Sequence, residues 1–552
     1  MIGLNKIGLN QVQLNRLRLN APFPAYGKMA GGGGSGDGFP QLPGDVTRWH
    51  FGGLTNEMMA AMDDPRIEDA DHKGRFLSFK NFAWKGMSGV GGVSTYYDKY
   101  EFTPDKYYMV AVSSGTQHAQ FTFKVTGLVD GNTLSLADTS SPSNVYGKWT
   151  QDGIYTVDID VINTDRSLYF YNGVSATRGE FTIEILPLYP GFILGDGVDD
   201  FAVTEKELNF EDTYTVYTAF IPLQNDPIKN MIVCGKDYKK DFYINYGTQL
   251  VFYTANSTKS IPLHINQFTV LLCKRDKTTG VIKNLVTGES FQFSVSQLIS
   301  NPGLYYLWRS ATVFSYGKTA IAGQTICNGY FSTDEDDEKV LDWYKKQYPW
   351  LFPDQAWTVT GKTNEDADRD TIANITGNGN DLVLSNFGFA EGSGYNEEGE
   401  YAGYLVTDGV DDRVQDSSFK LNKDWTLVGE WVFLNQKATN AGITKPFSFV
   451  VYNRTTGLSL FINTGTSGIT IENVKSIKAI CSDGRIYLDD WSEMLISKDQ
   501  DITSSTSVLS IGFNGTAYTQ MAFKNLGIYN NQILSKDDCI KAYNYLQTLK
   551  AK

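Results

Sequence analysis

The sequence is poor in the residues that build disulfide frameworks and metal centres. It has five cysteines and four histidines in 552 residues, and no two cysteines form a CxxC pair. An odd number of scattered cysteines fits neither a disulfide framework nor a zinc site. We therefore expect buried free thiols, made in a reducing cytosol, at Cys234, Cys273, Cys327, Cys481 and Cys539.

Positive charge and long apolar runs are also scarce. Lysine and arginine number 48 against 62 acidic residues, which gives a net charge of −14. Binding to nucleic acid needs clustered lysine and arginine, so we expect no nucleic-acid partner. No run of 18 apolar residues occurs, so we expect no membrane insertion. The first twenty residues lack the apolar stretch of a secretion signal, so we expect release by cell lysis.

Aromatic residues are plentiful. They make up 13% of the chain, and hydrophobic residues make up 41%. Aromatic side chains favour pleated, half-buried surfaces, which indicates an all-β protein. A single core rarely exceeds roughly 250–300 residues, so about three or four domains are expected.

The N-terminus repeats every five residues. Its units are MIGLN, KIGLN, QVQLN and RLRLN. Such short units cannot bury their own apolar side chains, so they must dock on a larger assembly. We interpret residues 1–20 as an anchor that binds other proteins of a particle through the apolar residues Ile2, Leu4, Ile7, Leu9, Val12, Leu14, Leu17 and Leu19. A disordered tail is the alternative.

Residues 21–73 are rich in glycine and proline and are predicted to be a linker. A short helix is expected from residue 54, ending before Pro65. Residues 74–189 then alternate apolar and polar residues, from FLSFKNF at the start to EFTIEIL near the end. Turn residues interrupt this pattern at short intervals, which predicts one β-sandwich of about eight strands.

Two later segments are copies of one module, at residues 190–350 and 351–552. Each contains DGVDD, at 196–200 and 408–412, followed by strand-like sequence and a final amphipathic stretch. A capping pattern precedes each final stretch, Ser332 with Glu335 and Ser535 with Asp538. We therefore predict three tandem sandwiches, of which the last two each end in a short helix.

This order of features resembles the concanavalin A-like, laminin-G-type jelly roll. The segment NGNDLVLSNF, at 378–387, looks like the opening strand of that family. The N-terminal anchor, LYPGFILGDGVDD at 188–200 and the tandem modules are also similar to fibre-type virion proteins of tailed phages that infect gut Bacteroidetes, including the crAss-like group. The resemblance implies lectin-like domains on a particle surface, and the fold alone does not assign a function.

Relatives of this fold that cleave polysaccharides need carboxylates on alternate positions of one strand. No Glu-x-Asp-x-Glu run occurs, and Glu184 and Glu430 each stand without an acidic partner in their strand. We therefore predict no catalytic residues, no enzyme activity and no cofactor. Acids from separate strands could still come together in the fold.

Two acidic segments are candidates for a structural calcium ion. Asp366, Asp368 and Asp370 form D-x-D-x-D, but Thr371 and Gly377 stand where a calcium loop needs Gly and Glu. The DGVDD segments either hold calcium or form tight turns with Gly197 and Gly409 at positive φ. We favour a solvated loop for the first and turns for the second, so no metal is expected.

The most consistent interpretation is a virion structural protein, a head or tail fibre or appendage, that displays lectin-like domains for adhesion to host-surface glycans. It would act at the virion surface as a homo-oligomer, and we expect a trimer, because multiple copies strengthen weak sugar contacts. The alternatives are a tail-associated polysaccharide-degrading enzyme and a bacterial surface adhesin. The sequence does not identify glycan-binding residues, because it does not show which aromatic residues are exposed; examples are Tyr96, Tyr97, Tyr305, Tyr306, Trp308 and Trp357.

Overall fold

The computed structural model describes residues 38–551 with internal gaps. The eight anchor residues, Ile2 to Leu19, lie outside the described residues, so the anchor stays a prediction. The gaps in the description are residues 55–57, 60, 83–98, 103–107, 111–117, 129–132, 138–144, 161–167, 173–180, 188, 196–198, 224–230, 236–242, 255–256, 297–302, 310–317, 378, 418, 436–441, 446–448, 455–456, 463–468, 473, 497–505 and 515.

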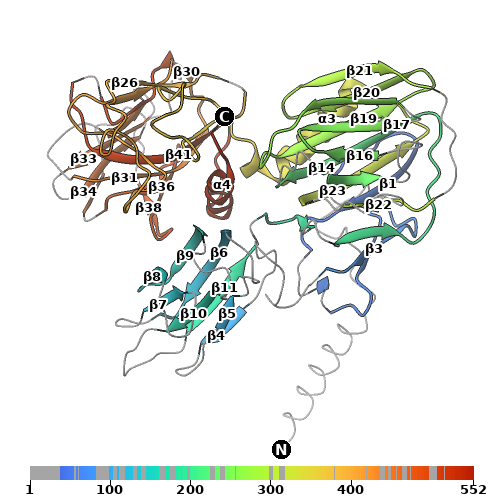
Figure 1. Cartoon of the computed structure of the whole chain (residues 1–552), viewed down its shortest axis with the longest axis horizontal. Helices are drawn as coiled ribbons and strands as arrows, with labels where there is room; N and C mark the ends of the chain where they lie inside the picture. The colour runs from blue at the N-terminus through green and yellow to red at the C-terminus, as the bar shows by residue number, and fades with distance from the viewer. Residues whose placement is uncertain are drawn as a thin grey trace, which may run out of the picture.

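The described chain is an all-β protein built from antiparallel sheets, and its two long helices follow the last strands of two similar modules (Figure 1). The all-β prediction is confirmed. No described helix has the length and apolar character needed to cross a membrane.

Module 1 is a sandwich of two sheets. One sheet follows the order β1 (Asp45–His50), β23 (Thr319–Asn328), β14 (Tyr214–Pro222), β19 (Thr269–Arg275), β20 (Thr279–Asn284) and β21 (Ser290–Ser294), and β12 (Ile193–Leu194) also pairs with β23. The other follows β18 (Ser257–Pro262), β17 (Gln249–Thr254), β16 (Tyr243–Tyr246), β15 (Met231–Gly235), β22 (Tyr306–Leu307), β13 (Phe201–Thr204), β3 (Phe76–Lys80) and β2 (Arg66–Glu68). Their inward side chains form one buried cluster, which includes Trp49, Val216 and Leu271 from the first sheet and Leu77, Ala202 and Ile244 from the second.

The N-terminal part of module 1 differs from the prediction. Residues 45–50 and 66–68, expected in a linker, are strands β1 and β2, and residues 76–80, expected in the next sandwich, are strand β3. Sequence reasoning missed β1 and β3 because their partner strands β23 and β13 lie more than 120 residues further along the chain, and β2 pairs with β3. Of the helix expected near residue 58, Met58 and Met59 are helical among the described positions.

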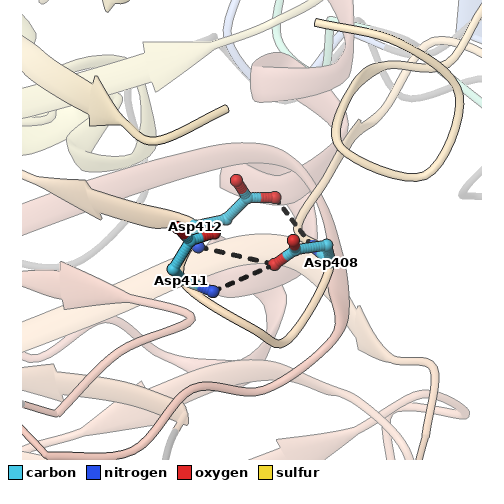
Figure 2. A group of neighbouring side chains, drawn as sticks. All are labelled: Asp408, Asp411 and Asp412. Carbon is cyan, nitrogen blue, oxygen red and sulfur yellow. Dashed lines mark hydrogen bonds between the residues drawn. The ribbon is translucent and has the colours of Figure 1, made fainter. Parts of the chain in front are cut away.

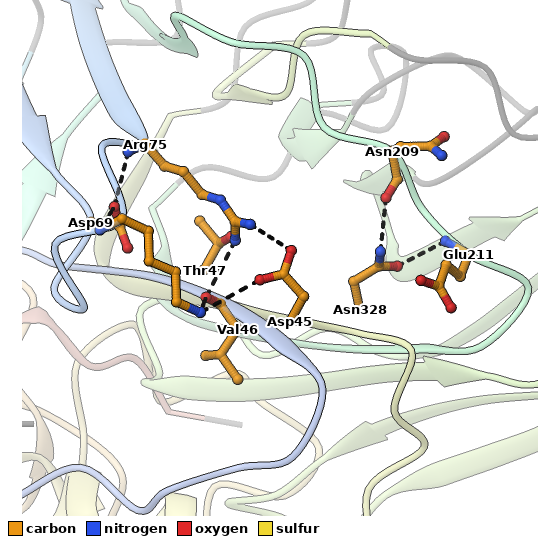
Figure 3. Close-up of polar contacts among 9 residues, drawn as sticks. Asp45, Val46, Thr47, Asp69, Arg75, Asn209, Glu211 and Asn328 are labelled. Atoms are coloured by element: carbon orange, nitrogen blue, oxygen red, sulfur yellow. Dashed lines mark hydrogen bonds and ion pairs between the residues drawn. The ribbon is translucent and has the colours of Figure 1, made fainter. Parts of the chain in front are cut away.

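Side-chain contacts hold this early segment in place (Figure 3). Arg75 binds the carboxylate of Asp45 and the hydroxyl of Thr47, and its backbone N–H donates to Asp69 Oδ1 at 3.0 Å. At the same end of this strand pair, where Asn328 pairs with Asp45, Asn328 Nδ2 donates to the carbonyl of Asn209 at 2.9 Å, and the Glu211 N–H donates to Asn328 Oδ1 at 2.7 Å.

Between β3 and β12 the chain forms a separate, smaller sandwich, the inserted domain. One sheet has the order β5 (Tyr108–Val110), β10 (Leu168–Asn172), β7 (Leu134–Ala137) and β8 (Val145–Trp149), and the other β4 (Lys99–Phe102), β11 (Phe181–Leu186), β6 (His118–Thr126) and β9 (Gly153–Asp160). Its core includes Phe123, Leu136, Phe170 and Ile183. The predicted sandwich therefore forms, but it is nested within module 1 rather than placed before it in tandem.

Module 2 repeats the architecture of module 1. One sheet follows β27 (Gly394–Tyr395), β28 (Leu405–Val406), β41 (Met521–Asn530), β31 (Trp425–Phe433), β36 (Ile477–Cys481), β37 (Arg485–Leu488) and β38 (Glu493–Leu495), with β24 (Gln355–Thr358) also paired to β41. The other follows β25 (Thr371–Ile372), β26 (Leu382–Ser385), β29 (Arg413–Gln415), β40 (Ser510–Ile511), β32 (Gly442–Lys445), β33 (Phe449–Arg454), β34 (Gly457–Ile462) and β35 (Ile469–Glu472). A short pair joins β30 (Phe419–Lys420) to β39 (Thr506–Ser507).

The two modules match residue by residue at several points. Asn81 and Asn386 both adopt φ 70°, and the amide of each donates at 3.0 Å to a DGVDD carbonyl, that of Asp199 or Asp411. Strands β14 and β31 carry bulges at equivalent places. The segment Thr47–Asn81 therefore corresponds to Gln355–Asn386, and the inserted domain replaces the short connection between Asn386 and β28.

The two helices are capped differently from one another. Helix α4 (Lys536–Thr548) begins after Ser535, whose hydroxyl accepts from the Asp538 N–H at 3.1 Å, as predicted. Helix α3 (Asp334–Gln347) begins after Thr333, which forms a capping box with Asp336, so the predicted pair Ser332–Glu335 is wrong by one residue. Ser332 is buried instead, and its hydroxyl donates to Asp337 Oδ1 at 2.7 Å.

The two modules share a buried interface. The 3-10 helix η1 (Pro349–Leu351) connects them, and Trp350 packs edge-on against Tyr545 of α4 at a centroid distance of 5.9 Å. The Phe268 N–H donates to the Tyr545 hydroxyl at 3.1 Å, and Tyr529 Oη donates to the Trp350 carbonyl at 2.8 Å. Figure 1 shows α4 on the side of module 2 that faces module 1. The modules therefore dock as one unit through a common apolar cluster.

Candidate functional site

The three aspartates of the D-x-D-x-D segment do not converge. Asp366 accepts from the Thr363 N–H and hydroxyl, Asp368 pairs with Lys362 Nζ at 2.8 Å, and Asp370 accepts from the Thr371 hydroxyl at 3.3 Å. Each carboxylate thus has a different local partner. This arrangement fits the solvated loop that we favoured over a calcium site.

The acidic group whose oxygens approach within 4.8 Å, in the part of the chain that the structure describes, is Asp408, Asp411 and Asp412 (Figure 2). Asp408 Oδ1 accepts backbone N–H groups from Val410 at 2.7 Å, Asp411 at 3.3 Å and Asp412 at 3.4 Å. Asp412 Oδ2 in turn accepts from the Asp408 N–H at 2.8 Å. These oxygens already bind the turn's own backbone.

Glycine and burial complete this turn. Gly409 has φ +75°, and a Cβ there would lie 2.8 Å from the Gln520 nitrogen. Burial raises the pKa of Asp412 to about 6 despite its hydrogen bonds to the Asp408 N–H and Ser393 Oγ. The favoured interpretation of the second DGVDD segment, a tight turn, matches this geometry. Asp196 and Gly197 of the first segment lie outside the described residues.

Glu430, which stands alone in its strand, is tied into a network beneath α4. Its carboxylate accepts from the Tyr404 hydroxyl at 2.6 Å and from Gln547 Nε2 of α4 at 2.6 Å, and it lies 3.9 Å from Lys478 Nζ. Burial alone would raise its pKa, but the nearby Lys478 and Lys524 charges and the tyrosine hydroxyls outweigh burial, so its pKa lies below the ordinary value. A general acid needs a raised pKa, and the pKa of Glu430 is shifted in the opposite direction.

The aromatic residues named from the sequence divide into buried and half-exposed side chains. Tyr305, Trp308 and Trp357 are fully buried in the module cores, whereas Tyr306 is half-buried on the outer face of module 1. Tyr96 and Tyr97 lie outside the described residues. Tyr306 lies beside Phe201, with ring centroids 6.3 Å apart, and the guanidinium of Arg309 lies over both rings.

The comparisons with known proteins identify no family. No protein-family model matches the chain, and no curated protein matches it. Among solved structures, the botulinum neurotoxin serotype C1 binding domain is 10% identical with a TM-score of 0.25. The match covers 60% of this chain and 88% of that domain's chain. Domain 4 of AbnA, an extracellular arabinanase of Geobacillus stearothermophilus, was solved with arabinotriose and is 16% identical with a TM-score of 0.20. That match covers 28% of this chain and 80% of the AbnA domain. Likenesses at these scores carry no argument about the function of this chain.

Proposed function

We propose that this protein is a non-enzymatic, glycan-binding appendage of a bacteriophage particle, attached through residues 1–20 and displaying its sandwiches outward. The observation that carries the non-enzymatic part is the state of the acidic side chains. Among the described residues, the three acids whose oxygens lie within 4.8 Å of one another form a backbone-capping turn, and the Glu430 carboxylate is bound by Tyr404 and Gln547. Glycoside cleavage needs two carboxylates free to act across a bond, and neither of these groups offers such a pair.

The docked modules support a display role. The shared cluster around Trp350 and Tyr545 fixes module 1 relative to module 2, so each chain presents its surface in a fixed orientation. Several copies on one particle would then bind one host surface together, because each further contact forms at a high effective concentration. A trimer at the virion surface would multiply the effect, and adhesion to host-surface glycans is the proposed outcome.

Particle attachment is tested by two sets of substitutions in the pentad repeat, one at its leucines and one at the residues between its apolar positions. One variant replaces Leu4, Leu9, Leu14 and Leu19 by serine, and its matched control replaces the residues between the apolar positions, Gly3, Gly8, Gln13 and Arg18, by serine. The copy number per purified particle is then measured by mass spectrometry. We expect the leucine variant to be lost from particles and the control to be retained. Retention of the leucine variant at the wild-type copy number would contradict the attachment proposal.

A bacterial surface adhesin is the other candidate with the same binding chemistry. It would be found in the cell envelope rather than in particles released by lysis. The same mass spectrometry, applied to envelope fractions and to particles, separates the two.

A further inference from the structure

The outer face of one sheet in module 1 carries three aromatic residues. Phe76 on β3, Phe201 on β13 and Tyr306 on β22 point away from the core, because their neighbours Leu77, Ala202 and Leu307 are buried in it. All three rings are half-buried. We call this surface, made by β2, β3, β13 and β22, the aromatic face.

The equivalent positions of module 2 hold no aromatic residues. Strand registers align Lys80 and Phe201 with Ser385 and Arg413, and Val203 and Tyr306 with Gln415 and Ser510. Counting back from the matching Asn81 and Asn386, Phe76 corresponds to Asp381. Three aromatic residues in module 1 thus stand where module 2 has an aspartate, an arginine and a serine. Module 2 forms the same sheet without rings at these positions, so the rings are a feature of module 1 alone.

Charged groups lie among the rings. The Arg66 guanidinium lies 5.0 Å from the Phe76 ring centroid and donates to Glu205 Oε1 at 2.9 Å, and Ser78 Oγ donates to the same oxygen at 3.1 Å. The Arg309 guanidinium lies 4.5 Å from the Phe201 ring centroid and 5.4 Å from that of Tyr306. A guanidinium held flat on a ring presents its N–H fork in a fixed orientation.

The combination of aromatic rings with charged and polar groups favours some classes of ligand over others. Protein interfaces and membrane-binding surfaces present a continuous apolar centre, but here Ser78, Glu205 and two arginines interrupt the rings. A pyranose chain has the matching chemistry, because each sugar has an apolar C–H face and hydroxyl groups around its edge. Rigid aromatic rings with a few fixed polar groups are the lining expected for such a ligand.

We propose that the aromatic face of module 1 is a polysaccharide-binding site. Sugar C–H faces pack on Phe76, Phe201 and Tyr306, and sugar hydroxyls bind Arg66, Arg309 and Glu205. The site rests on the proposed glycan-binding function and gives it a location: module 1 binds, and the same face of module 2 does not.

The test uses the full chain and a panel of purified bacterial capsular polysaccharides, some neutral and some containing uronic acids. The key variant, Phe76→Asp/Phe201→Arg/Tyr306→Ser, carries the residues that module 2 already tolerates at these positions. The matched control, Val383→Ser, changes the outer face of module 2, where Val383 is 52% exposed. We expect at least a tenfold weaker Kd for the triple variant and an unchanged Kd for the control.

The outcomes are distinguishable. If the wild type binds a polysaccharide and the folded triple variant binds it equally well, the aromatic face is not the site, although the proposed function stands. If the wild type binds no member of the panel, the proposed function fails as well. Should the triple variant not fold, Tyr306→Ser and Arg309→Ala are each expected to weaken binding at least threefold, and unchanged binding in both would overturn the site. Binding to phosphatidylcholine vesicles without polysaccharide binding would also overturn it.

Discussion

Lys274 Nζ lies 3.0 Å from Asp337 Oδ2 in module 1, and the equivalent positions of module 2 hold Cys481 and Cys539. Lys274 pairs with Thr215 across the sheet as Cys481 pairs with Thr426, and Asp337 and Cys539 each stand four residues after the N-cap of their helix. Both pairs join the final helix to the sheet beneath it. The same tether is thus an ion pair in one copy and two buried thiols in the other.

Removing one partner of the ion pair is expected to destabilise module 1 strongly. Both side chains are nearly inaccessible, at 7% and 2% exposure, so Asp337→Ala leaves a buried ammonium without its carboxylate. The expected loss in free energy of unfolding is roughly 3–5 kcal/mol. Asp342→Ala on the same helix removes a carboxylate that is 64% exposed, and the expected change is below about 1 kcal/mol. Urea unfolding measures both, and equal losses in the two variants would contradict the assignment.

Two substitutions of Asp408 distinguish backbone capping from metal binding in the DGVDD turn of module 2. Asp408→Asn keeps an oxygen that can accept the three backbone N–H groups, so the Tm of module 2 should stay near that of the wild type. Asp408→Ala leaves those donors without their acceptor and should cost about 1–3 kcal/mol. Thermal unfolding with and without EDTA is the measurement. A fall in Tm on chelation, matched by Asp408→Asn, would show that a cation holds the turn.

Asp416 is expected to make the stability of module 2 depend on pH. Burial raises its pKa to about 6. Oδ1 accepts from the Leu509 N–H at 2.9 Å, but the buried Oδ2 has no hydrogen-bond partner among the described residues. The unfolded carboxyl has a pKa near 3.9. The folded state therefore binds the proton more tightly, and stability is lost as pH rises from about 4 to about 6.

Asp416→Asn should remove this loss, because an amide carries no charge and keeps the acceptor for Leu509. The gain at pH 7 is expected to be roughly 1–3 kcal/mol, measured by urea unfolding at pH 4.5 and pH 7. Asp424→Asn, which changes an exposed acid of the same module, is the control. An unchanged pH slope in Asp416→Asn would show that Asp416 is not the titrating group.

Trp350 is expected to hold the two modules together. It is 1% exposed and contacts Tyr545 of α4. Trp350→Ala should cost about 3–5 kcal/mol of interface and core packing and make residues 349–354 accessible to protease. Phe291→Ala, which changes a side chain that is 45% exposed in module 1, is the control. Limited proteolysis checks both variants. Equal resistance in Trp350→Ala and the wild type would show that other contacts suffice for docking.

Much of the architecture follows from local sequence patterns. Alternation predicted the strands, the DGVDD repeat revealed two copies of one module, and the Ser535 cap was read correctly because its pattern spans only four residues. The five cysteines are buried and free, as their spacing indicated. These features depend on residues that are close together in the chain.

Features that depend on distant pairing were not predictable in the same way. Residues 45–50 read as linker because their partner strand lies near residue 325, and residues 76–80 read as part of the neighbouring sandwich because the inserted domain follows them directly. Which aromatic residues are buried also depends on distant pairing. Local sequence does not distinguish Tyr305, Tyr306 and Trp308, and it is the pairing of β22 with β13 that directs Tyr306 outward. The aromatic face was missed for this reason. Aligning 76–80 with 381–385 would have shown it.

The most direct test of the account measures binding and cleavage in the same reaction. The full chain is incubated with capsular polysaccharides of candidate host bacteria, and bound protein and newly formed reducing ends are quantified together over time. The account predicts saturable binding to at least one polysaccharide with no increase in reducing ends. Reducing ends that accumulate in proportion to protein concentration, or an absence of binding to every polysaccharide, would contradict it.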